Sequence, residues 1–578
     1  MAAELLRPLR STRWLSGDDE VALLHRVAMR SAGAPLDGRV DRPVIGIAHS
    51  ASELNPCNMP LAELAEAVRR GVLAAGGIPV VFATLSLGED LMKPSAMLYR
   101  NLLAIEVEET LRSYPIDGAV LLATCDKTVP AVVMGAVSAD LPSIVVTGGT
   151  REPAVYRGRR IGTGTDLWRV SEERRAGLVS DDAWRELEQS LSCGRGACNT
   201  MGTAATMAIL TEALGLSLPG SSTAPSGSSG RVAFAESSGR RAVELVIEGL
   251  RPSALLNRAS FENAIRVLNA VGGSTNAVIH LTAIAGRAAI PLGLDDFSSI
   301  GSEIPVLVDV EPAGSGLVPD FHDSGGLPAL LAEISSYLDL DASTVAGSLA
   351  SIVEAAPRRG PAIRPAAQPL EERGAFAVLR GNLAPDGAIL RTCTASAELF
   401  VHEGPAVVFD GYEDMRRRID EPNPHLCGTS VLVLRGCGPV GGPGMPEWGM
   451  IPIPASLAKA GVRDMVRVTD ARMSGTSYGT VVLHVAPEAA VGGPLAAVVD
   501  GDLIRVDVEK GIIELVVDDD ELDRRLARWS PPSHREMRGW VALYKRSVSQ
   551  APRGCDLDFL EAPTQAHRAV VEPVVGRS

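Results

Sequence analysis

The strongest constraint on the fold is an alternation of short apolar runs with helical segments over the first two-thirds of the chain. The segment 60–77 places Leu61, Leu64 and Val68 on one helix face, between an opening proline and a closing Gly-Gly pair. Such alternation predicts an α/β N-terminal domain, with a parallel sheet flanked by helices, over residues 1–368. The expected strands are 42–50, 78–84, 117–124 and 141–149, with a further helix at 129–140.

From about residue 370 the pattern changes to short β-rich runs separated by glycine, proline and aspartate turns. This pattern is typical of a barrel or closed sandwich, so we predict a mostly β, barrel-like C-terminal domain over residues 369–578. The Pro- and Ala-rich stretch 356–374 is the expected linker. The Ser- and Gly-rich stretch 217–231 is expected to form a mobile loop. The expected β runs are 375–383, 406–412, 429–436, 464–470, 479–485 and 494–518.

Composition narrows the class of protein. A chain of 578 residues exceeds the size of one hydrophobic core. Its net charge of −15 disfavours nonspecific nucleic-acid binding, which needs a basic surface. No apolar stretch reaches the roughly 18 residues of a membrane span, and the N-terminus lacks a signal-peptide pattern. Eight cysteines are too sparse for a disulfide scaffold. We therefore expect a cytoplasmic enzyme that binds a small molecule and neither nucleic acid nor membrane.

Three cysteines lie where an α/β sheet binds ligands. Cys125 follows an expected strand, and Cys57 and Cys198 each precede a helical segment. Helix N-termini lower the pKa of a thiol, so all three could be thiolates that hold an iron–sulfur cluster with one iron open to substrate. The alternative is that each is an inert buried thiol, because no CxxC pair is present. That alternative is assigned to the remaining cysteines, Cys193, Cys393, Cys427, Cys437 and Cys555.

Three carboxylates are candidate ligands of a hard cation. Asp126 directly follows Cys125, and Glu89 and Glu447 stand in glycine-rich loops. Carboxylate oxygens suit Mg²⁺, whereas the alternative for each glutamate is a capping or surface role. Lys127 would repel a cation unless its charge were removed. Carbamylation would remove that charge and turn the side chain into another oxygen ligand.

Ser474 follows an expected strand in the turn "DARMSGTSYGT". A serine in such a turn usually satisfies the backbone. The catalytic alternative is an alkoxide, which needs a nearby cation because no histidine is close in sequence.

Together these segments resemble the dihydroxy-acid and sugar-acid dehydratase family (IlvD/Edd), from about residue 10 to about residue 517. The stretch "SLGEDLMKPSAMLYRNL" resembles the aldonate branch more than the branched-chain amino-acid branch. Departures occur at Pro60, where the family has histidine, and in "HSASELNPCN" and "LSCGRGACN". The motifs that agree, in order, are "PCN", "CDKTVPA", "GACNTMGTAATM", "EALGLSLPG", "GGSTNAVIHL", "GNLAPDGA", "GGPGMPE" and "GGPLAAVVDGD".

The resemblance implies the cofactors and the reaction. It implies dehydration of an aldonate to its 2-keto-3-deoxy acid by a homodimer or homotetramer. In that reaction Ser474 removes the C2 proton and a cluster iron acts as Lewis acid on the C3 hydroxyl. Two alternatives stay open: the dihydroxy-acid dehydratase of branched-chain amino-acid biosynthesis, and a non-catalytic iron–sulfur sensor. The implied ligands are Cys57, Cys125 and Cys198 for a [2Fe–2S] cluster, and Glu89, Asp126, carbamylated Lys127 and Glu447 for Mg²⁺.

Overall fold

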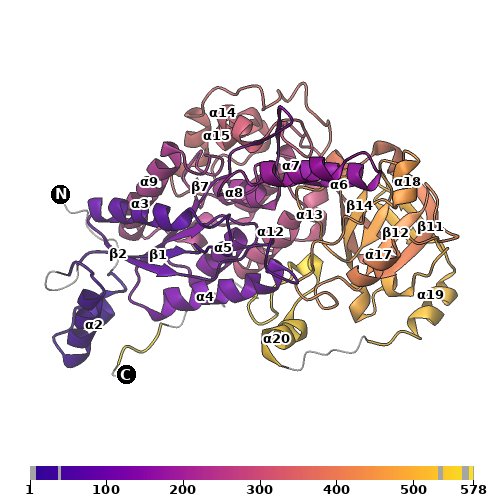
Figure 1. Ribbon diagram of the computed structural model, residues 1–578. Helices are drawn as coiled ribbons and strands as arrows, with labels where there is room; N and C mark the ends of the chain where they lie inside the picture. The colour runs from indigo at the N-terminus through magenta and orange to yellow at the C-terminus, as the bar shows by residue number, and fades with distance from the viewer. Residues whose placement is uncertain (1–7, 37–40, 532–537, 563–571, 577–578) are drawn as a thin grey trace.

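The computed structural model describes residues 8–36, 41–531, 538–562 and 572–576. Figure 1 shows a helix-rich N-terminal half around one open sheet, beside a C-terminal half dominated by strands. Within the described part of the chain, no helix combines the length and the apolar character needed to cross a membrane.

The N-terminal sheet is parallel and has the strand order β2-β1-β3-β4. Every residue of β3 and β4 is buried, as expected for strands covered on both faces. Because the strands are parallel, the loops that follow them meet at one edge of the sheet. The strands are β1 (Val44–His49), β2 (Ile78–Ala83), β3 (Gly118–Ala123) and β4 (Ser143–Thr147), which confirms the four expected ones.

Helices cover both faces of this sheet, as predicted. In Figure 1, α3 (Leu61–Ala74) and α9 (Ser229–Glu248) lie on one face. The other face is covered by α4 (Arg100–Ser113) and α5 (Thr128–Ala139). The α3 and α9 backbones approach so closely that a Cβ at Gly71 would lie 1.9 Å from the carbonyl oxygen of Glu236. Glycine at this position therefore permits the close helix packing.

Two further helices, α8 (Thr203–Ala213) and α12 (Asn276–Arg287), are almost wholly buried and extend the core away from the sheet. The remaining helices of this half and two small hairpins lie outside this pair. These elements are α1 (Thr12–Leu15), α2 (Glu20–Ser31), α6 (Thr165–Arg175), α7 (Asp181–Leu191), α10 (Pro252–Leu255), α11 (Arg258–Ala270), α13 (Leu294–Ser299), α14 (Val318–Asp323), α15 (Gly326–Glu333), α16 (Leu349–Glu354), β5 (Ala154–Tyr156) with β6 (Arg159–Ile161), and β7 (Ser343–Thr344) with β8 (Gly347–Ser348).

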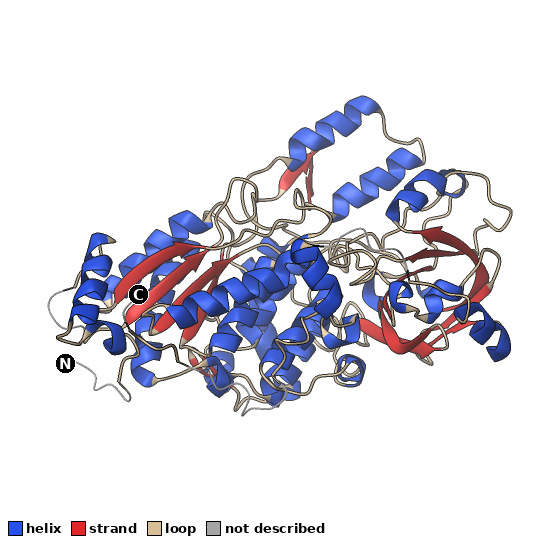
Figure 2. Ribbon diagram, turned by 90° about the horizontal axis from the view of Figure 1, so that it is seen from below, coloured by secondary structure: helices blue, strands red, loops and turns tan. Residues whose placement is uncertain are grey.

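The C-terminal half contains a closed barrel with the strand order β10-β14-β13-β12-β11-β15-β16-β9. Figure 2 shows these strands grouped at the opposite end of the molecule from the open sheet. This confirms the barrel-like domain. The strands are β9 (Phe376–Gly381), β10 (Ala384–Arg391), β11 (Val401–Asp410), β12 (Val431–Arg435), β13 (Arg467–Thr469), β14 (Val481–Ala486), β15 (Leu503–Asp507) and β16 (Ile512–Leu515), with helices α17 (Tyr412–Arg418), α18 (Ala455–Lys459) and α19 (Asp519–Leu526).

Strand β10 was not among the expected runs. Its first half contains Pro385, Asp386 and Gly387, which are typical of a turn. The barrel accommodates them by a register shift between Ala384 and Ala388 in the pairing of β10 with β9. An irregularity of this kind lets turn-forming residues lie inside a strand.

The Ser- and Gly-rich stretch 217–231 is not one continuous surface loop, because residues 221–224 are buried and residues 229–231 begin α9, so the expectation of a mobile loop is wrong for these parts. Ser221, Ser222 and Ala224 are buried. The Glu212 carboxylate accepts hydrogen bonds from the backbone N–H groups of Gly220 and Ser222, at 2.6 and 2.8 Å. The small side chains of this stretch allow the close approach. The buried carboxylate provides hydrogen-bond partners for backbone N–H groups that, from composition alone, would be expected to bond to water.

The end of the chain returns to the N-terminal half through α20 (Gly539–Ser547) and the residues after it. Asp556 forms a fully buried, two-bonded ion pair with Arg287 of α12, with N···O distances of 2.8 and 3.0 Å. Arg100 of α4 donates to the carbonyl oxygens of Gly554 and Cys555 at 2.8 and 2.9 Å. The C-terminal segment thus helps to fix the two halves against each other.

Candidate active site

One pocket of about 340 Å³ lies between the two halves, at the carboxyl edge of the open sheet. Lys127 is buried beside it and contacts three of the lining carboxylates. The structure therefore brings together every residue that the sequence marked as a candidate for the site. The predicted residues that line the pocket are Cys57, Glu89, Cys125, Asp126, Cys198, Glu447 and Ser474.

Asn58 joins the loops that carry these groups. Its Oδ1 accepts from the backbone N–H groups of Thr124 and Cys125 at 3.2 and 3.1 Å. Its Nδ2 donates to the hydroxyl groups of Ser86 and Thr128 at 3.0 and 3.2 Å. A single buried amide thus holds together the segments that follow β1, β2 and β3.

The three predicted cysteine ligands all line the pocket. The Cys57 and Cys125 thiols share a hydrogen bond, which is the main cause of the lowered pKa of Cys57, and Arg151 assists from 3.8 Å. The pKa of Cys125 is instead raised, first by its bond to Cys57 and then by burial, and burial raises that of Cys198 to about 12. The expectation that helix N-termini lower all three pKa values is therefore wrong for Cys125 and Cys198. Three thiols that line one pocket are nevertheless a donor set that suits an iron–sulfur cluster.

The three carboxylates converge. Glu89, Asp126 and Glu447 each offer an oxygen, and these oxygens lie within 4.8 Å of one another. Lys127 is fully buried among them, with its Nζ 2.5 Å from Asp126, 2.6 Å from Glu447 and 3.6 Å from Glu89. Convergent carboxylate oxygens of this kind fit a hard divalent cation.

Arg472 completes the charged cluster, and sequence reasoning assigned it no role. It is fully buried and donates to Glu447 Oε1 at 2.7 Å, to the Met445 carbonyl oxygen at 2.7 Å and to Ser95 Oγ at 3.0 Å. Ser95 in turn donates to Glu89 at 3.0 Å. Arg472 thus orients Glu447 directly and Glu89 through Ser95.

Burial and charge compete at these groups. Burial and Arg472 lower the pKa of Lys127, but the three carboxylates outweigh them, so the net pKa is raised. Burial raises the pKa of Asp126, but Lys127 and Arg472 outweigh burial and the net pKa is lowered. At Glu89 burial dominates and the pKa is raised. With Lys127 as an ammonium, the five groups together carry one net negative charge.

Asn276, at the start of α12, connects the carboxylates to the serine turn. Its Nδ2 donates to Glu447 Oε1 at 2.9 Å and to the Met473 carbonyl oxygen at 3.2 Å. Asn276 belongs to the motif "GGSTNAVIHL", which is the feature of the sequence that points to this residue.

Ser474 is half-buried and faces the same pocket. Its Oγ lies 3.0 Å from Thr476 Oγ1, and its carbonyl oxygen accepts from the N–H of Ser477 at 3.0 Å. Arg391 donates to the Gly475 carbonyl oxygen at 2.8 Å, which holds the turn against β10. The turn serine and the carboxylates are therefore parts of one site.

Comparison with known families gives the class of this protein. The model for the N-terminal part of the dihydroxy-acid/6-phosphogluconate dehydratases matches residues 42–352, and the model for their C-terminal part matches residues 361–555. The chain therefore belongs to the dihydroxy-acid/6-phosphogluconate dehydratase family, whose enzymes are hydro-lyases.

Individual relatives cover nearly the whole chain. It is 46% identical over 575 residues to a 6-deoxy-6-sulfo-D-gluconate dehydratase from Pseudomonas putida, covering 99% of each chain. It is also 46% identical over 563 residues to an L-arabinonate dehydratase from Rhizobium leguminosarum, covering 97% of each. A dihydroxy-acid dehydratase from Acidothermus cellulolyticus is 40% identical over 542 residues, which are 92% of this chain and 95% of that relative. The predicted resemblance to the sugar-acid branch is confirmed.

Proposed function

We propose that this enzyme dehydrates a sugar acid to the corresponding 2-keto-3-deoxy acid. The observation that carries the proposal is the single pocket in which three cysteines, three convergent carboxylates and the Ser474 turn face one another. The 46% identity to two enzymes named as sugar-acid dehydratases supports the choice of substrate class.

We assign Cys57, Cys125 and Cys198 as ligands of a [2Fe–2S] cluster. We assign Glu89, Asp126, Glu447 and a carbamylated Lys127 as ligands of Mg²⁺. When bound, Mg²⁺ supplies positive charge to the substrate carboxylate and C2 hydroxyl, and the cluster supplies a Lewis-acidic iron toward the C3 hydroxyl.

Charge balance supports the carbamylated form of Lys127. Carbamylation would change this side chain from one positive to one negative charge, and a divalent cation would compensate for that difference. The buried group would then keep the same net charge as the metal-free group. A large change of net charge inside a buried site would be costly. Carbamylation of Lys127 together with binding of Mg²⁺ leaves the net charge unchanged, which favours the carbamylated form when the cation is bound.

The proposed reaction removes a proton from C2 and the hydroxyl group from C3. Ser474, as an alkoxide, takes the proton from C2, and the C2–H electron pair forms the C2=C3 bond. The C3 hydroxyl leaves with its bonding pair and takes that proton from Ser474, so that water is released and the alkoxide is restored. The resulting enol gains a proton at C3 and loses the proton of its C2 hydroxyl, which gives the 2-keto-3-deoxy acid. A proton next to a carboxylate is weakly acidic, so its removal needs positive charge nearby, which the Arg472 guanidinium supplies beside Glu447.

The second candidate is dehydration of a branched dihydroxy acid, supported by the 40% identical relative. The pocket wall favours the sugar acid, because the charged side chains of Asp90 and Lys93 line it. The hydroxyl groups of a sugar acid can pair with these charged groups, whereas a branched alkyl chain cannot.

The test is a substrate panel with anaerobically purified protein. Pentonates, hexonates and 2,3-dihydroxyisovalerate are compared at equal concentration, with the 2-keto product as the readout. Turnover of at least one aldonate at ten times the rate of the dihydroxy acid is expected. Turnover of the dihydroxy acid alone would establish the second candidate. A cluster-loaded, Mg²⁺-supplied protein that turns over neither class would refute both dehydratase proposals and favour the sensor alternative.

A further inference from the structure

We propose that the N-terminus of α9 and the buried Arg231 together form a binding site for a phosphate group, in a pocket separate from the candidate active site. The proposal goes beyond the dehydratase reaction and does not depend on it. The pocket has a volume of about 350 Å³, and among the described residues none lines both this pocket and the candidate active site. We call it the α9 pocket, and its lining includes Gly148, Ser226, Gly227, Arg231 and Val232.

Arg231 is a buried guanidinium whose hydrogen bonds all go to uncharged acceptors. Only 1% of the residue is exposed. Its Nη1 donates to the carbonyl and hydroxyl oxygens of Thr147, at 2.8 and 3.2 Å, and its Nη2 donates to the carbonyl oxygen of Ala224. Within the described part of the chain, its Nε–H group has no partner. A buried positive charge in this state is costly, and an anion bound in the pocket would compensate for it.

The N-terminus of α9 supplies further donors to the same place. The helix is 20 residues long, and the Oγ of Ser228 caps it by accepting from the N–H of Arg231 at 3.1 Å. The N–H groups of Ser229 and Gly230, in the first turn, have no acceptor within the helix. A Cβ at Gly227, which lines the pocket, would meet no atom within 4 Å, so open space lies beside the helix start. A helix N-terminus with open space in front of it favours an anion such as phosphate.

Acidic side chains of the protein do not supply this anion. Glu63 and Glu152 also line the α9 pocket, but both are exposed, and Glu63 lies 3.5 Å from Arg195. The charge of Glu212 attracts Arg231, but its two oxygens already accept backbone N–H groups of the Ser- and Gly-rich stretch. Burial outweighs this attraction and lowers the pKa of Arg231 to about 9, so the guanidinium stays charged at neutral pH.

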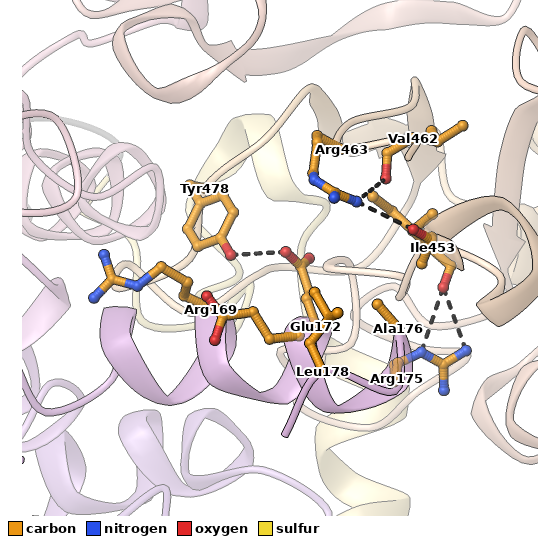
Figure 3. A pocket seen from close by; sticks show the side chains of 11 residues that line it. Arg169, Glu172, Arg175, Ala176, Leu178, Ile453, Val462, Arg463 and Tyr478 are labelled. Atoms are coloured by element: carbon orange, nitrogen blue, oxygen red, sulfur yellow. Dashed lines mark hydrogen bonds between the residues drawn. The ribbon is translucent and has the colours of Figure 1, made fainter. Parts of the chain in front are cut away.

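A second pocket lined by arginines shows the contrast. It has a volume of about 330 Å³ and lies between α6 and the C-terminal half. Figure 3 shows Arg175 bonded to the carbonyl oxygen of Ile453, and Arg175 also pairs with Asp420 at 2.7 Å. The carboxylate of Glu172 faces the same pocket and accepts from the Tyr478 hydroxyl at 2.7 Å. Carboxylates of the protein thus compensate the positive charge there, so that pocket does not call for an external anion.

A phosphate group suits the α9 pocket better than a carboxylate does. Its oxygens accept hydrogen bonds from several directions at once, and the site offers donors from a guanidinium and from a helix N-terminus. Inorganic phosphate and the phosphate group of a small ester share this chemistry. The probes are therefore inorganic phosphate, glucose 6-phosphate and acetate.

The test is titration of each probe into the whole protein, purified without oxygen, by calorimetry at constant ionic strength. The wild type should bind inorganic phosphate saturably, and phosphate should raise its Tm, because a ligand of the folded state stabilises that state. Tighter binding of glucose 6-phosphate than of inorganic phosphate would support an ester as the ligand, and the reverse order would support free phosphate. Acetate should bind more weakly than either. No saturable binding of phosphate, or acetate bound as tightly as phosphate, would overturn the proposal.

Variants at Val232 locate the bound phosphate. Val232 lines the pocket and is 40% exposed, so a polar side chain is tolerated there. Val232→Glu adds a negative charge and should weaken phosphate binding by about tenfold, whereas the uncharged control Val232→Gln should stay within about twofold of the wild type. Equal phosphate affinity in these two variants would place the anion elsewhere and refute the site.

Arg231→Lys tests the guanidinium itself. It keeps a positive charge but lacks the Nε–H group and the planar fork, and it should weaken phosphate binding by about tenfold or more. Wild-type affinity in a folded Arg231→Lys protein would remove Arg231 from the site and overturn the proposal. If this variant fails to fold, the Val232 pair decides. Because the readout is phosphate binding, the result is independent of whether the protein dehydrates a sugar acid.

Discussion

The ammonium group of Lys127 lies 2.6 Å from Oε1 of Glu447, although the two residues are 320 positions apart in the sequence. The same oxygen also accepts hydrogen bonds from Arg472 and Asn276. This one carboxylate oxygen therefore has three donors, two from the N-terminal half and one from the C-terminal half. Lys127 has no exposed surface, and an uncompensated buried charge costs about 3–5 kcal/mol. The charged cluster therefore exists only when the two halves are docked.

The first prediction concerns the hard cation. Chelation with EDTA should abolish turnover, and Mg²⁺ should restore it with the iron–sulfur absorbance unchanged, because the two sites use different donors. Glu447→Gln should raise the Mg²⁺ concentration needed for half-activation by about tenfold or more, since one ligand loses its charge. The matched control is Asp90→Asn, which lines the same pocket outside the carboxylate group and should leave that concentration unchanged. Full turnover after exhaustive chelation would remove Glu89, Asp126 and Glu447 from the mechanism.

The second prediction concerns the cysteines. Protein purified without oxygen should be brown and contain about two irons per chain, as a [2Fe–2S] cluster requires. Cys57→Ser, Cys125→Ser and Cys198→Ser should each lose colour, iron and activity. Iron and sulfide analysis together with the visible spectrum provide the measurement.

Cys427→Ser and Cys555→Ser are the controls, the first at an exposed thiol and the second at a buried one away from the pocket lining. Both should keep wild-type iron content. Iron retained in all three ligand variants would show that the cysteine assignment is wrong.

Much of this site was predictable because an apolar run followed directly by cysteine or charged residues is easy to recognise in a sequence. The buried run before Cys125 identifies β3, and a parallel sheet places the end of β3 beside the loop that carries Cys57. Glu89, Glu447 and Ser474 were identified as candidate site residues from local sequence motifs, not from hydrophobic periodicity. Their roles stay predictions, although the structure places them in one pocket.

The groups that orient those residues were not predictable. Arg472, Asn276 and Trp168 each bond to partners in another segment, such as Ser95, Glu447 and Thr476. Hydrophobic periodicity shows which face of an element is buried, but it does not say which buried polar groups will pair across 100 or more positions. Strand β10 was missed for a related reason, because the barrel overrides the turn preference of its first residues.

The third prediction is a pH dependence of stability centred on Glu488, which supports the loop leading to Glu447. Its carboxylate accepts from the N–H groups of Val440 and Gly441, each at 2.8 Å. Burial, and then the nearby Asp470, raise the pKa of Glu488 to about 7, above the ordinary value of 4.5. The folded state therefore binds more protons between these values, so this group makes the protein less stable as pH rises through that window.

Glu488→Gln should remove this dependence. Between pH 5 and pH 8, the wild type should lose about 2 kcal/mol of unfolding free energy relative to the variant. Denaturant unfolding at several pH values measures the difference, and Glu413→Gln, at an exposed position on α17, is the control that should follow the wild-type profile. Parallel profiles for wild type and Glu488→Gln would contradict the prediction.

The last prediction tests Ser474 as the base, which is the boldest assignment because a lone serine hydroxyl is weakly acidic. Ser474 faces the carboxylate pocket, and its turn is held by Arg391 and by helix α6. Ser474→Ala should therefore keep fold, iron and Mg²⁺ binding but lose roughly 10³-fold or more in kcat, as loss of a catalytic base commonly does. Ser477→Ala is the control, because its hydroxyl is buried in the same turn and does not line the pocket. Exchange of the substrate C2 proton with deuterated solvent is the deciding measurement. If Ser474→Ala exchanges that proton at the wild-type rate, another residue removes it and the assignment fails.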